Sequence, residues 1–149
     1  MKTIRRVLHA GAAAVLLAAG LTLAGPAPTA SAAAAGSDPG ACVANGRTSA
    51  YGPQYVCGLW RGNVPVYSWP YANEPVVGYL YEGGRANWFT GQCRSYNNNL
   101  TPAYFHLGGY YNSWWAYTMA DNGKWGWVNL VYFAGGDNDQ ASAVLPSAC

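Results

Sequence analysis

The sequence predicts a small all-β domain, either a barrel or a sandwich, on three observations. Short apolar or alternating runs recur along the chain, and Gly, Asn and Pro separate them. Helical periodicity is almost absent beyond Pro39. Asn122-Gly123 lies between flanks rich in aromatic and β-branched residues, which is one of the strongest local signals for a β-hairpin. Several short strands joined by turns are typical of both all-β architectures.

Residues 1–35 have the pattern of an export signal, with a positive start, an apolar middle and a cleavage site of small residues. The apolar run is shorter than the roughly 20 residues that a membrane span needs, so cleavage is favoured over an uncleaved anchor. We expect the mature protein to be secreted, extracellular or associated with the cell wall, and not bound to a membrane. The three parts of the signal are Lys2, Arg5 and Arg6, then residues 10–24, then Ala30-Ser31-Ala32.

The charge of the predicted mature part differs from that of the whole chain. The chain has eight basic and six acidic residues, a net charge of +2. Three of the basic residues lie in the signal, which leaves five basic against six acidic residues and a net charge of −1. Such a composition lacks the basic footprint of a nucleic-acid binder and the polybasic patch of a membrane-surface protein. Nucleic acid is therefore not expected as a partner.

The mature part, about 115 residues long, has the size of one domain. Residues 36–63 are predicted to form an extension tied by a disulfide, and residues 64–149 to form the β domain. Residues 93–113 interrupt that domain as a long inserted loop. Aromatic residues make up 15% of the chain, so some rings are expected to be accessible in so small a domain. The predicted strands are residues 64–69, 76–81, 86–92, 114–119, 125–130 and 131–133.

All four cysteines lie after the predicted cleavage site, which is an even number in an exported chain. They indicate two disulfides, for which three pairings are possible. We favour Cys42–Cys57, which closes a short local loop, together with Cys93–Cys149. No C-x-x-C pair occurs, and His106 is the only histidine after residue 35, so no metal site is predicted.

A two-residue turn at Asn122-Gly123 predicts the register of the surrounding hairpin. Under this register Ala120 faces Trp125, and Thr118 faces Trp127. Large indole rings then lie over small neighbours on one face of the hairpin. That face carries Trp114, Ala116, Thr118, Ala120, Trp125 and Trp127, and the other carries Trp115, Tyr117, Met119, Gly126 and Val128.

Four segments in order resemble the bacterial SH3 (SH3b) pattern, and the chain is similar to small secreted SH3-like proteins of Gram-positive bacteria. The resemblance covers residues 64–133 and implies a five-stranded, partly open barrel that adheres to cell-wall material or another extracellular ligand. Three features depart from the pattern: the extension, the insertion, and Y-S-W-P at residues 67–70, where the family has R-S-G-P. The matching segments are V-P-V-Y-S at 64–68, E-P-V-V-G-Y-L at 74–80, W-W-A-Y at 114–117 and G-K-W-G-W-V at 123–128, with Tyr132-Phe133 as the final pair.

The resemblance places Val128 in the barrel interior, so the hairpin face with three indoles would point outward. Three indoles side by side would offer a flat, stiff platform for stacking on sugar faces or packing against peptide. In the alternative, the insertion or the extension folds over them as a second small core. Both interpretations remain open. The predicted platform is Trp114, Trp125 and Trp127.

The insertion combines polar amides with aromatic residues, a composition typical of adaptable recognition surfaces. Long loops in compact domains are also often functional. The alternative is a loop tethered by Cys93 whose aromatic residues cap the barrel. The ligand-binding candidates within the insertion are Tyr96, Tyr110 and Tyr111.

No catalytic group or cofactor is expected. Residues 135–140 gather oxygen ligands, but two carboxylates alone make a poor Ca²⁺ site, and a solvated turn is favoured. Glu74, Glu82 and Asp121 have the context of turn residues rather than of a paired acid and base. No G-x-S-x-G motif supplies a nucleophilic serine that His106 could activate, and no zinc-type pair of histidines is present.

Three function classes follow from these features. The first is a secreted, non-catalytic binding module for cell-wall peptidoglycan or another surface glycan or peptide. The second is a secreted inhibitor or effector of an extracellular protein such as a protease, which would use the tethered loop of residues 93–113. The third, a small lytic enzyme, is disfavoured because no catalytic pair is evident.

Overall fold

The computed structural model describes residues 38–149, apart from the side chains of Arg85 and Ala86. The predicted export signal and its cleavage site lie outside the described residues. Within residues 38–149, ten strands and two short 3-10 helices confirm the all-β class. No helix of this part of the chain is long and apolar enough to cross a membrane.

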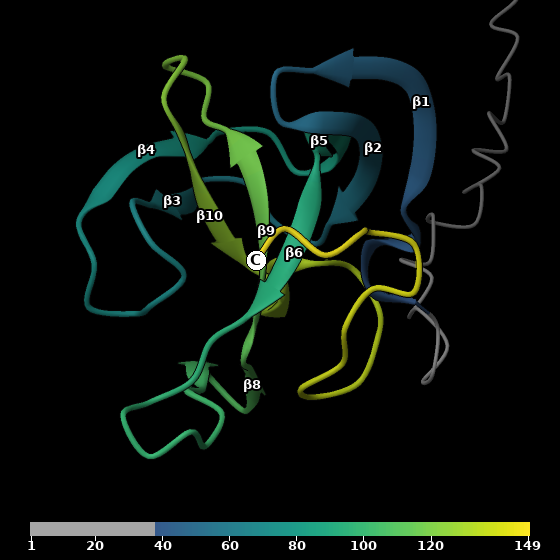
Figure 1. The fold of residues 1–149 in the computed structure, drawn as a ribbon. Helices are drawn as coiled ribbons and strands as arrows, with labels where there is room; N and C mark the ends of the chain where they lie inside the picture. The colour runs from purple at the N-terminus through teal and green to yellow at the C-terminus, as the bar shows by residue number, and fades with distance from the viewer. Residues whose placement is uncertain (1–37) are drawn as a thin grey trace, which may run out of the picture. The chain divides into compact units, whose positions relative to one another are not determined.

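The strands form antiparallel sheets (Figure 1). One sheet has three strands in the order β1-β2-β5, a second has five in the order β4-β3-β10-β9-β6, and β7 pairs with β8. The five-stranded sheet is open, with β4 and β6 at its edges. The strands are β1 (Val43–Ser49), β2 (Gly52–Leu59), β3 (Val64–Tyr67), β4 (Val76–Leu80), β5 (Gly84–Phe89), β6 (Gly91–Arg94), β7 (Phe105–Leu107), β8 (Tyr110–Asn112), β9 (Trp114–Met119) and β10 (Trp125–Asn129), and the 3-10 helices are η1 (Pro39–Ala41) and η2 (Leu130–Tyr132).

The predicted strand at residues 86–92 is two strands that belong to different sheets. β5 pairs with β2, whereas β6 pairs with β9. Thr90 lies between them, and its backbone N–H donates to the Tyr117 carbonyl at 2.9 Å. This run of the chain therefore joins the two larger sheets at a corner.

The predicted last strand at residues 131–133 is wrong, because the helix η2 occupies this position. The Asn129 side chain accepts a hydrogen bond from the Val131 backbone N–H at 2.9 Å, which caps the helix. Only Phe133 makes a strand-type bridge, to Leu59 of β2.

The disulfide-tied extension shares its sheet and its core with the rest of the domain. β2 lies between β1 and β5, and Cys57 and Leu59 are buried in the same cluster as Val64 and Val128. The strands β1 and β2 were not predicted. One continuous core thus spans the extension and the β domain; its aliphatic and aromatic members include Leu59, Val64, Val66, Leu80, Phe89, Val128, Leu130, Tyr132, Phe133 and Leu145.

The two predicted disulfides, Cys42–Cys57 and Cys93–Cys149, are confirmed. The second holds the C-terminal segment along β6, where Ala148 N donates to the Gln92 carbonyl at 2.8 Å. The buried Gln92 side chain donates to the carbonyls of Ser142 and Leu145 and accepts from Ser142 N. Every polar group of this amide is therefore paired, and the segment of residues 142–148 is fixed against the sheet.

Near η1, hydrogen bonds hold the start of the described chain against residues 134–143. We call these bonds the clasp. The Asp38 carboxylate accepts hydrogen bonds from the Ser142 hydroxyl and from the Ala143 backbone N–H. Gly40 N also donates to the Ala134 carbonyl at 2.8 Å. The two bonds of Asp38 join residues that are 104 and 105 positions apart in sequence.

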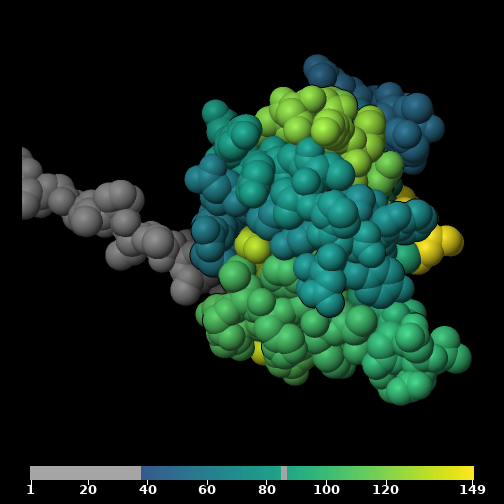
Figure 2. Space-filling model, turned by 90° about the vertical axis from the view of Figure 1, so that its left-hand side faces the viewer, coloured from purple at the N-terminus to yellow at the C-terminus, as the bar shows by residue number. Residues whose placement is uncertain are grey.

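The insertion lies at one end of the described domain, opposite to the β1–β2 and β9–β10 turns (Figures 1 and 2). Figure 2 shows it as a green lobe of its own. Phe105 of β7 packs edge-on against Trp115 and Tyr67, with ring centroids 5.6 and 6.0 Å away. The insertion therefore caps one end of the core through Phe105 while its other aromatic residues face outward.

β10 passes close to β3 at Gly126. A Cβ atom there would meet the Tyr67 carbonyl oxygen and would lie 2.8 Å from Val66 Cγ1. We expect Gly126→Ala to lower the free energy of unfolding by about 1–3 kcal/mol, the usual cost of overpacking, as measured by urea denaturation. Gly109→Ala is the matched control, because nothing lies within 4 Å of a Cβ built there. Equal effects of the two substitutions would contradict this account.

Two buried tyrosines predict a loss of stability at alkaline pH. Burial raises the pKa of Tyr67 and of Tyr132; Tyr79 adds to the effect at Tyr67, and Arg61 partly opposes it at Tyr132. A raised pKa favours the neutral phenol in the fold, so this stability is present below about pH 10 and is lost as pH rises through the raised values. Urea denaturation across that range should show a falling free energy of unfolding, with a smaller fall in Tyr132→Phe. A flat profile would refute the prediction.

Candidate binding groove beside the β9–β10 hairpin

The β9–β10 turn has three residues, Asp121 to Gly123, rather than two. Ala120 N donates to the Lys124 carbonyl, and Gly123 N donates to the Ala120 carbonyl, both at 2.8 Å. Gly123 has a φ of +82°, which suits the left-handed position that follows a type I turn in three-residue hairpin loops. The predicted turn location is confirmed, but the predicted register is wrong by one residue.

Contacts with β4 account for the longer turn. The Asp121 carboxylate accepts from Tyr81 N at 2.7 Å, and Asp121 N donates to the Tyr79 carbonyl at 3.0 Å. The Asn122 amide donates to the Val77 carbonyl at 2.9 Å. These bonds hold Asp121 and Asn122 against residues 77–81 and out of the β9–β10 ladder.

The shift of one residue exchanges the faces of β10. Trp127 pairs with Tyr117, and Trp125 pairs with Met119, so both indoles lie on the face of Tyr117 and Trp115. Gly126 and Val128 take the core face with Ala116 and Thr118, and these four residues are buried.

Trp114 lies on the opposite face of β9 from Trp125 and Trp127, so the predicted platform of three indoles does not form. Its ring packs against the main core and carries the Arg94 guanidinium, 5.5 Å from the ring centroid. Alternation of side chains along β9 separates Trp114 from Tyr117 and from the two indoles that pair across the hairpin.

Trp125 and Trp127 instead belong to a group of five rings, here called the hairpin aromatic cluster. Tyr117 lies between the two indoles, with ring centroids 5.4 Å from Trp125 and 4.8 Å from Trp127. Tyr51, from the β1–β2 turn, lies over Trp125 at 4.4 Å. The extension therefore covers part of Trp125, and both indoles are half-buried. The cluster consists of Tyr51, Trp88, Tyr117, Trp125 and Trp127.

A groove of about 580 Å³, here called the hairpin groove, opens beside this cluster. Its volume falls in the usual range for ligand sites. Trp69 is 64% exposed at its edge, and the C-terminal segment held by Gln92 forms one wall. All of its lining residues are uncharged; they are Tyr51, Pro53, Ser68, Trp69, Thr90, Tyr117, Trp127, Pro146, Ser147 and Ala148.

The hairpin groove is lined by aromatic and small polar residues. Its residues supply aromatic faces, proline rings and hydroxyl groups, and no carboxylate or imidazole lines it. Burial, and then the neighbouring Tyr51, raise the pKa of Tyr117, so its phenol is a neutral hydrogen-bonding group at physiological pH. Stacking and hydrogen bonding are therefore available here.

Sequence reasoning found Trp127 but missed Tyr51, Trp69 and the C-terminal wall. Trp69 carries a signal that could have been used, because a tryptophan between Ser68 and Pro70 stands at the end of a predicted strand, where side chains tend to be exposed. No local pattern identifies Tyr51, since its role depends on the contact between the β1–β2 turn and β9.

The tyrosines predicted within the insertion are all exposed, but none lines the hairpin groove. Tyr96 follows β6, and the Arg94 guanidinium lies 5.9 Å from its ring centroid. Tyr110 and Tyr111 of β8 border a different cleft, together with Trp60 and Asn138.

The turn at residues 135–140 ties the insertion to the C-terminal part of the chain. The Asp139 carboxylate pairs with the Arg94 guanidinium at 2.5 Å and accepts from Ser113 N at 3.0 Å. Asn138 Oδ1 accepts from Tyr111 N at 3.0 Å. Residues 38–149 contain no group of three or more potential metal ligands of the His, Cys, Asp or Glu type.

Tyr51 covers Trp125 and also contacts Tyr117, so substitution of Tyr51 should change the Tyr117 pKa. Tyr51→Ala should lower the Tyr117 pKa, because it removes both the burying ring and the neighbouring phenol that raise it. Tyr51→Phe, which keeps the ring, should lower the Tyr117 pKa by less. Titration of ¹³C-labelled tyrosine resonances by NMR measures both values. The same Tyr117 pKa in both variants and the unaltered protein would contradict the cluster described above.

The comparisons with known proteins assign the chain to no family. No protein-family model, curated protein or solved structure matches this chain. A function is therefore inferred from the sequence pattern and from the geometry of the aromatic surfaces.

Proposed function

We propose that the protein is a secreted, non-catalytic binding module that holds a cell-wall glycan or peptide, or a similar extracellular ligand, in the hairpin groove. The observation that carries this proposal is the uncharged groove between Trp69 and the Tyr117–Trp127 pair. Rings give a large contact area at a small cost in conformational entropy, because each has only two side-chain torsions.

The hairpin groove is built to keep its shape, which favours binding. Tyr117 and Trp127 belong to a cluster of mutually packed rings. The opposite wall is fixed by Gln92 and by the Cys93–Cys149 disulfide. A preformed site loses little freedom on binding, so more of the contact energy appears as affinity.

The export signal predicted at residues 1–35 and the two disulfides support secretion, because disulfides form and persist in oxidising compartments. The resemblance of residues 64–133 to the SH3b pattern supports a role in adhesion to cell-wall material. The uncharged lining of the hairpin groove favours binding over acid–base catalysis.

One observation favours the alternative, a secreted inhibitor or effector of another protein such as a protease. Leu100 is 82% exposed at the tip of the insertion. Its loop is held by Asn97, whose Oδ1 accepts from Asn99 N at 2.9 Å and Thr101 N at 3.1 Å. A fixed loop with an exposed leucine could dock into a pocket of a partner protein.

Retention on purified peptidoglycan tests the proposed module. Trp69→Ala and Trp127→Ala should each weaken retention about tenfold or more, since stacking contributes roughly 1–3 kcal/mol per ring. Sedimentation of wall fragments with increasing protein concentration gives the apparent Kd of each variant. Tyr81→Ala is the matched control, because Tyr81 is exposed but lies outside the hairpin groove.

Two outcomes would reject the module. In the first, neither tryptophan variant changes retention although both keep the melting temperature of the parent protein. In the second, the protein ignores wall material but inhibits a panel of extracellular proteases, and Leu100→Ala abolishes that inhibition. The second result would establish the alternative function.

A further inference from the structure

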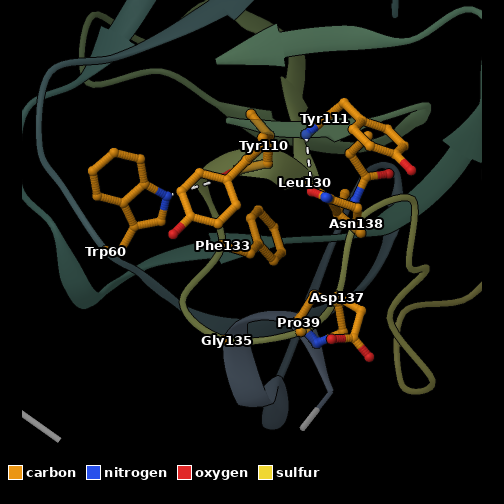
Figure 3. Close-up of a pocket in the computed structure, with 12 residues that line it drawn as sticks. Pro39, Trp60, Tyr110, Tyr111, Leu130, Phe133, Gly135, Asp137 and Asn138 are labelled. Carbon is orange, nitrogen blue, oxygen red and sulfur yellow. Dashed lines mark hydrogen bonds between the residues drawn. The ribbon is translucent and has the colours of Figure 1, made fainter. Parts of the chain in front are cut away.

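A second cleft, here called the Trp60 cleft, shares no lining residue with the hairpin groove. It also has a volume of about 580 Å³. It lies among Trp60 after β2, the insertion hairpin β7–β8, the helix η2 and the turn at residues 135–138 (Figure 3). Neither a structural nor a catalytic role accounts for its exposed rings.

Trp60 is exposed yet held in place. Half of its surface, 50%, is accessible to solvent. Its indole N–H donates to the Val131 carbonyl at 2.9 Å, and its backbone N–H donates to the Tyr132 carbonyl at 3.2 Å. The Arg61 guanidinium restrains the ring further, 5.5 Å from its centroid. A ring fixed in this way binds without losing rotamer freedom.

Tyr110 supplies a second accessible ring. It is 66% exposed on β8, and it comes to Trp60 from a segment 50 residues further along the chain. Figure 3 shows the rings of Trp60, Tyr110 and Phe133 following one another across the cleft. Trp60 and Tyr110 supply the accessible ring faces, whereas Phe133 is buried.

Polar groups gather at the other end of the cleft, around Asn138 and Asp137 (Figure 3). The hydrogen bond from Tyr111 N to Asn138 Oδ1 orients the Asn138 amide. Its amino group has no partner within residues 38–149 and is available as a donor. The Asp137 carboxylate, which lines the same cleft nearer to Pro39, is an acceptor. Gly136, at φ +80°, allows the turn to pass close to Pro39, because a Cβ at this position would lie 2.7 Å from Pro39 Cγ.

We propose that the Trp60 cleft is a second binding site, specific for an uncharged glycosyl residue. A pyranose ring presents a face of C–H groups, which packs on indole and phenol rings, and an edge of adjacent hydroxyls. The hydroxyls can accept a hydrogen bond from the Asn138 amide and donate one to the Asp137 carboxylate. Among residues 38–149, Asp137 is the only charged residue that lines the cleft, and it disfavours an anionic sugar there. The Arg61 guanidinium lies near the Trp60 ring but outside the lining.

This inference goes beyond the proposed function, because it concerns different residues and a defined ligand class. If both sites meet one wall polymer, binding at the first raises the effective concentration at the second. Trp69 and Trp127 report on the hairpin groove, whereas Trp60 and Tyr110 report on the Trp60 cleft. The failure of one site can therefore be distinguished from the failure of the other.

NMR titration with tri-N-acetylchitotriose tests the second site. The indole N–H resonance of Trp60 should shift in a saturable manner. Trp60→Ala and Tyr110→Ala should each raise the Kd for this sugar about tenfold or more, the effect of removing one stacked ring. Tyr96→Ala is the matched control on the insertion, because Tyr96 is exposed and lies outside the cleft. Trp60→Phe, which keeps an apolar ring, should lose less affinity than Trp60→Ala.

The charge argument has a test of its own. A hyaluronan tetrasaccharide, which carries carboxylates, should bind the parent protein more weakly than tri-N-acetylchitotriose does. Asp137→Asn keeps an acceptor oxygen but removes the charge, so it should narrow this difference. The proposal is overturned if the sugar produces no Trp60 shift, if its Kd for folded Trp60→Ala and Tyr110→Ala equals its Kd for the parent protein, or if only a decaproline peptide shifts Trp60.

Discussion

The hydrogen bonds that join Asp121 and Asn122 to residues 77–81 are the constraint on which the aromatic surface of the β9–β10 hairpin depends. They hold a three-residue turn, and that turn decides which residues of β10 face the core. Gly126 then lies against β3, where only a hydrogen atom fits, and Trp127 lies beside Tyr117 at the hairpin groove. A shift by one residue would bury the two indoles and expose the small residues instead. The surface chemistry of this face therefore follows from two polar side chains in a turn.

Much of the architecture could be predicted because its signals are local. The strand at Trp114–Met119 has the predicted limits, since aromatic and β-branched residues lie between clear turn residues on both sides. The preferred pairing of the four cysteines, with a short local loop closed by Cys42–Cys57, is also confirmed. The turn type could not be predicted in this way. Asn122-Gly123 suits both a two-residue and a three-residue turn, and the choice is made by contacts with residues 77–81, about 40 positions earlier in the chain.

The candidate site was only partly visible in the sequence for a related reason. Trp127 belongs to a recognisable hairpin, but Tyr51, Trp69 and Pro146 reach the hairpin groove from three separate segments. The corner at Thr90 brings two of the sheets together, and no periodic pattern reports a corner within an apolar run. In the insertion, composition correctly indicated exposed tyrosines. The partners of Tyr110 and Tyr111 in the Trp60 cleft, however, come from the extension and from the turn after η2.

The clasp between Asp38 and the segment at Ser142 and Ala143 has a consequence for how the protein folds. Its partners are separated by 104 and 105 residues, so they can meet only after nearly all of the chain has been delivered. Contacts of such long range make folding slow, and until they form, apolar strands remain open to association with other chains. The short Cys42–Cys57 loop has no such delay. Folding would thus run from an early local crosslink to a late closure of the two ends, and aggregation would compete mainly in the interval between them.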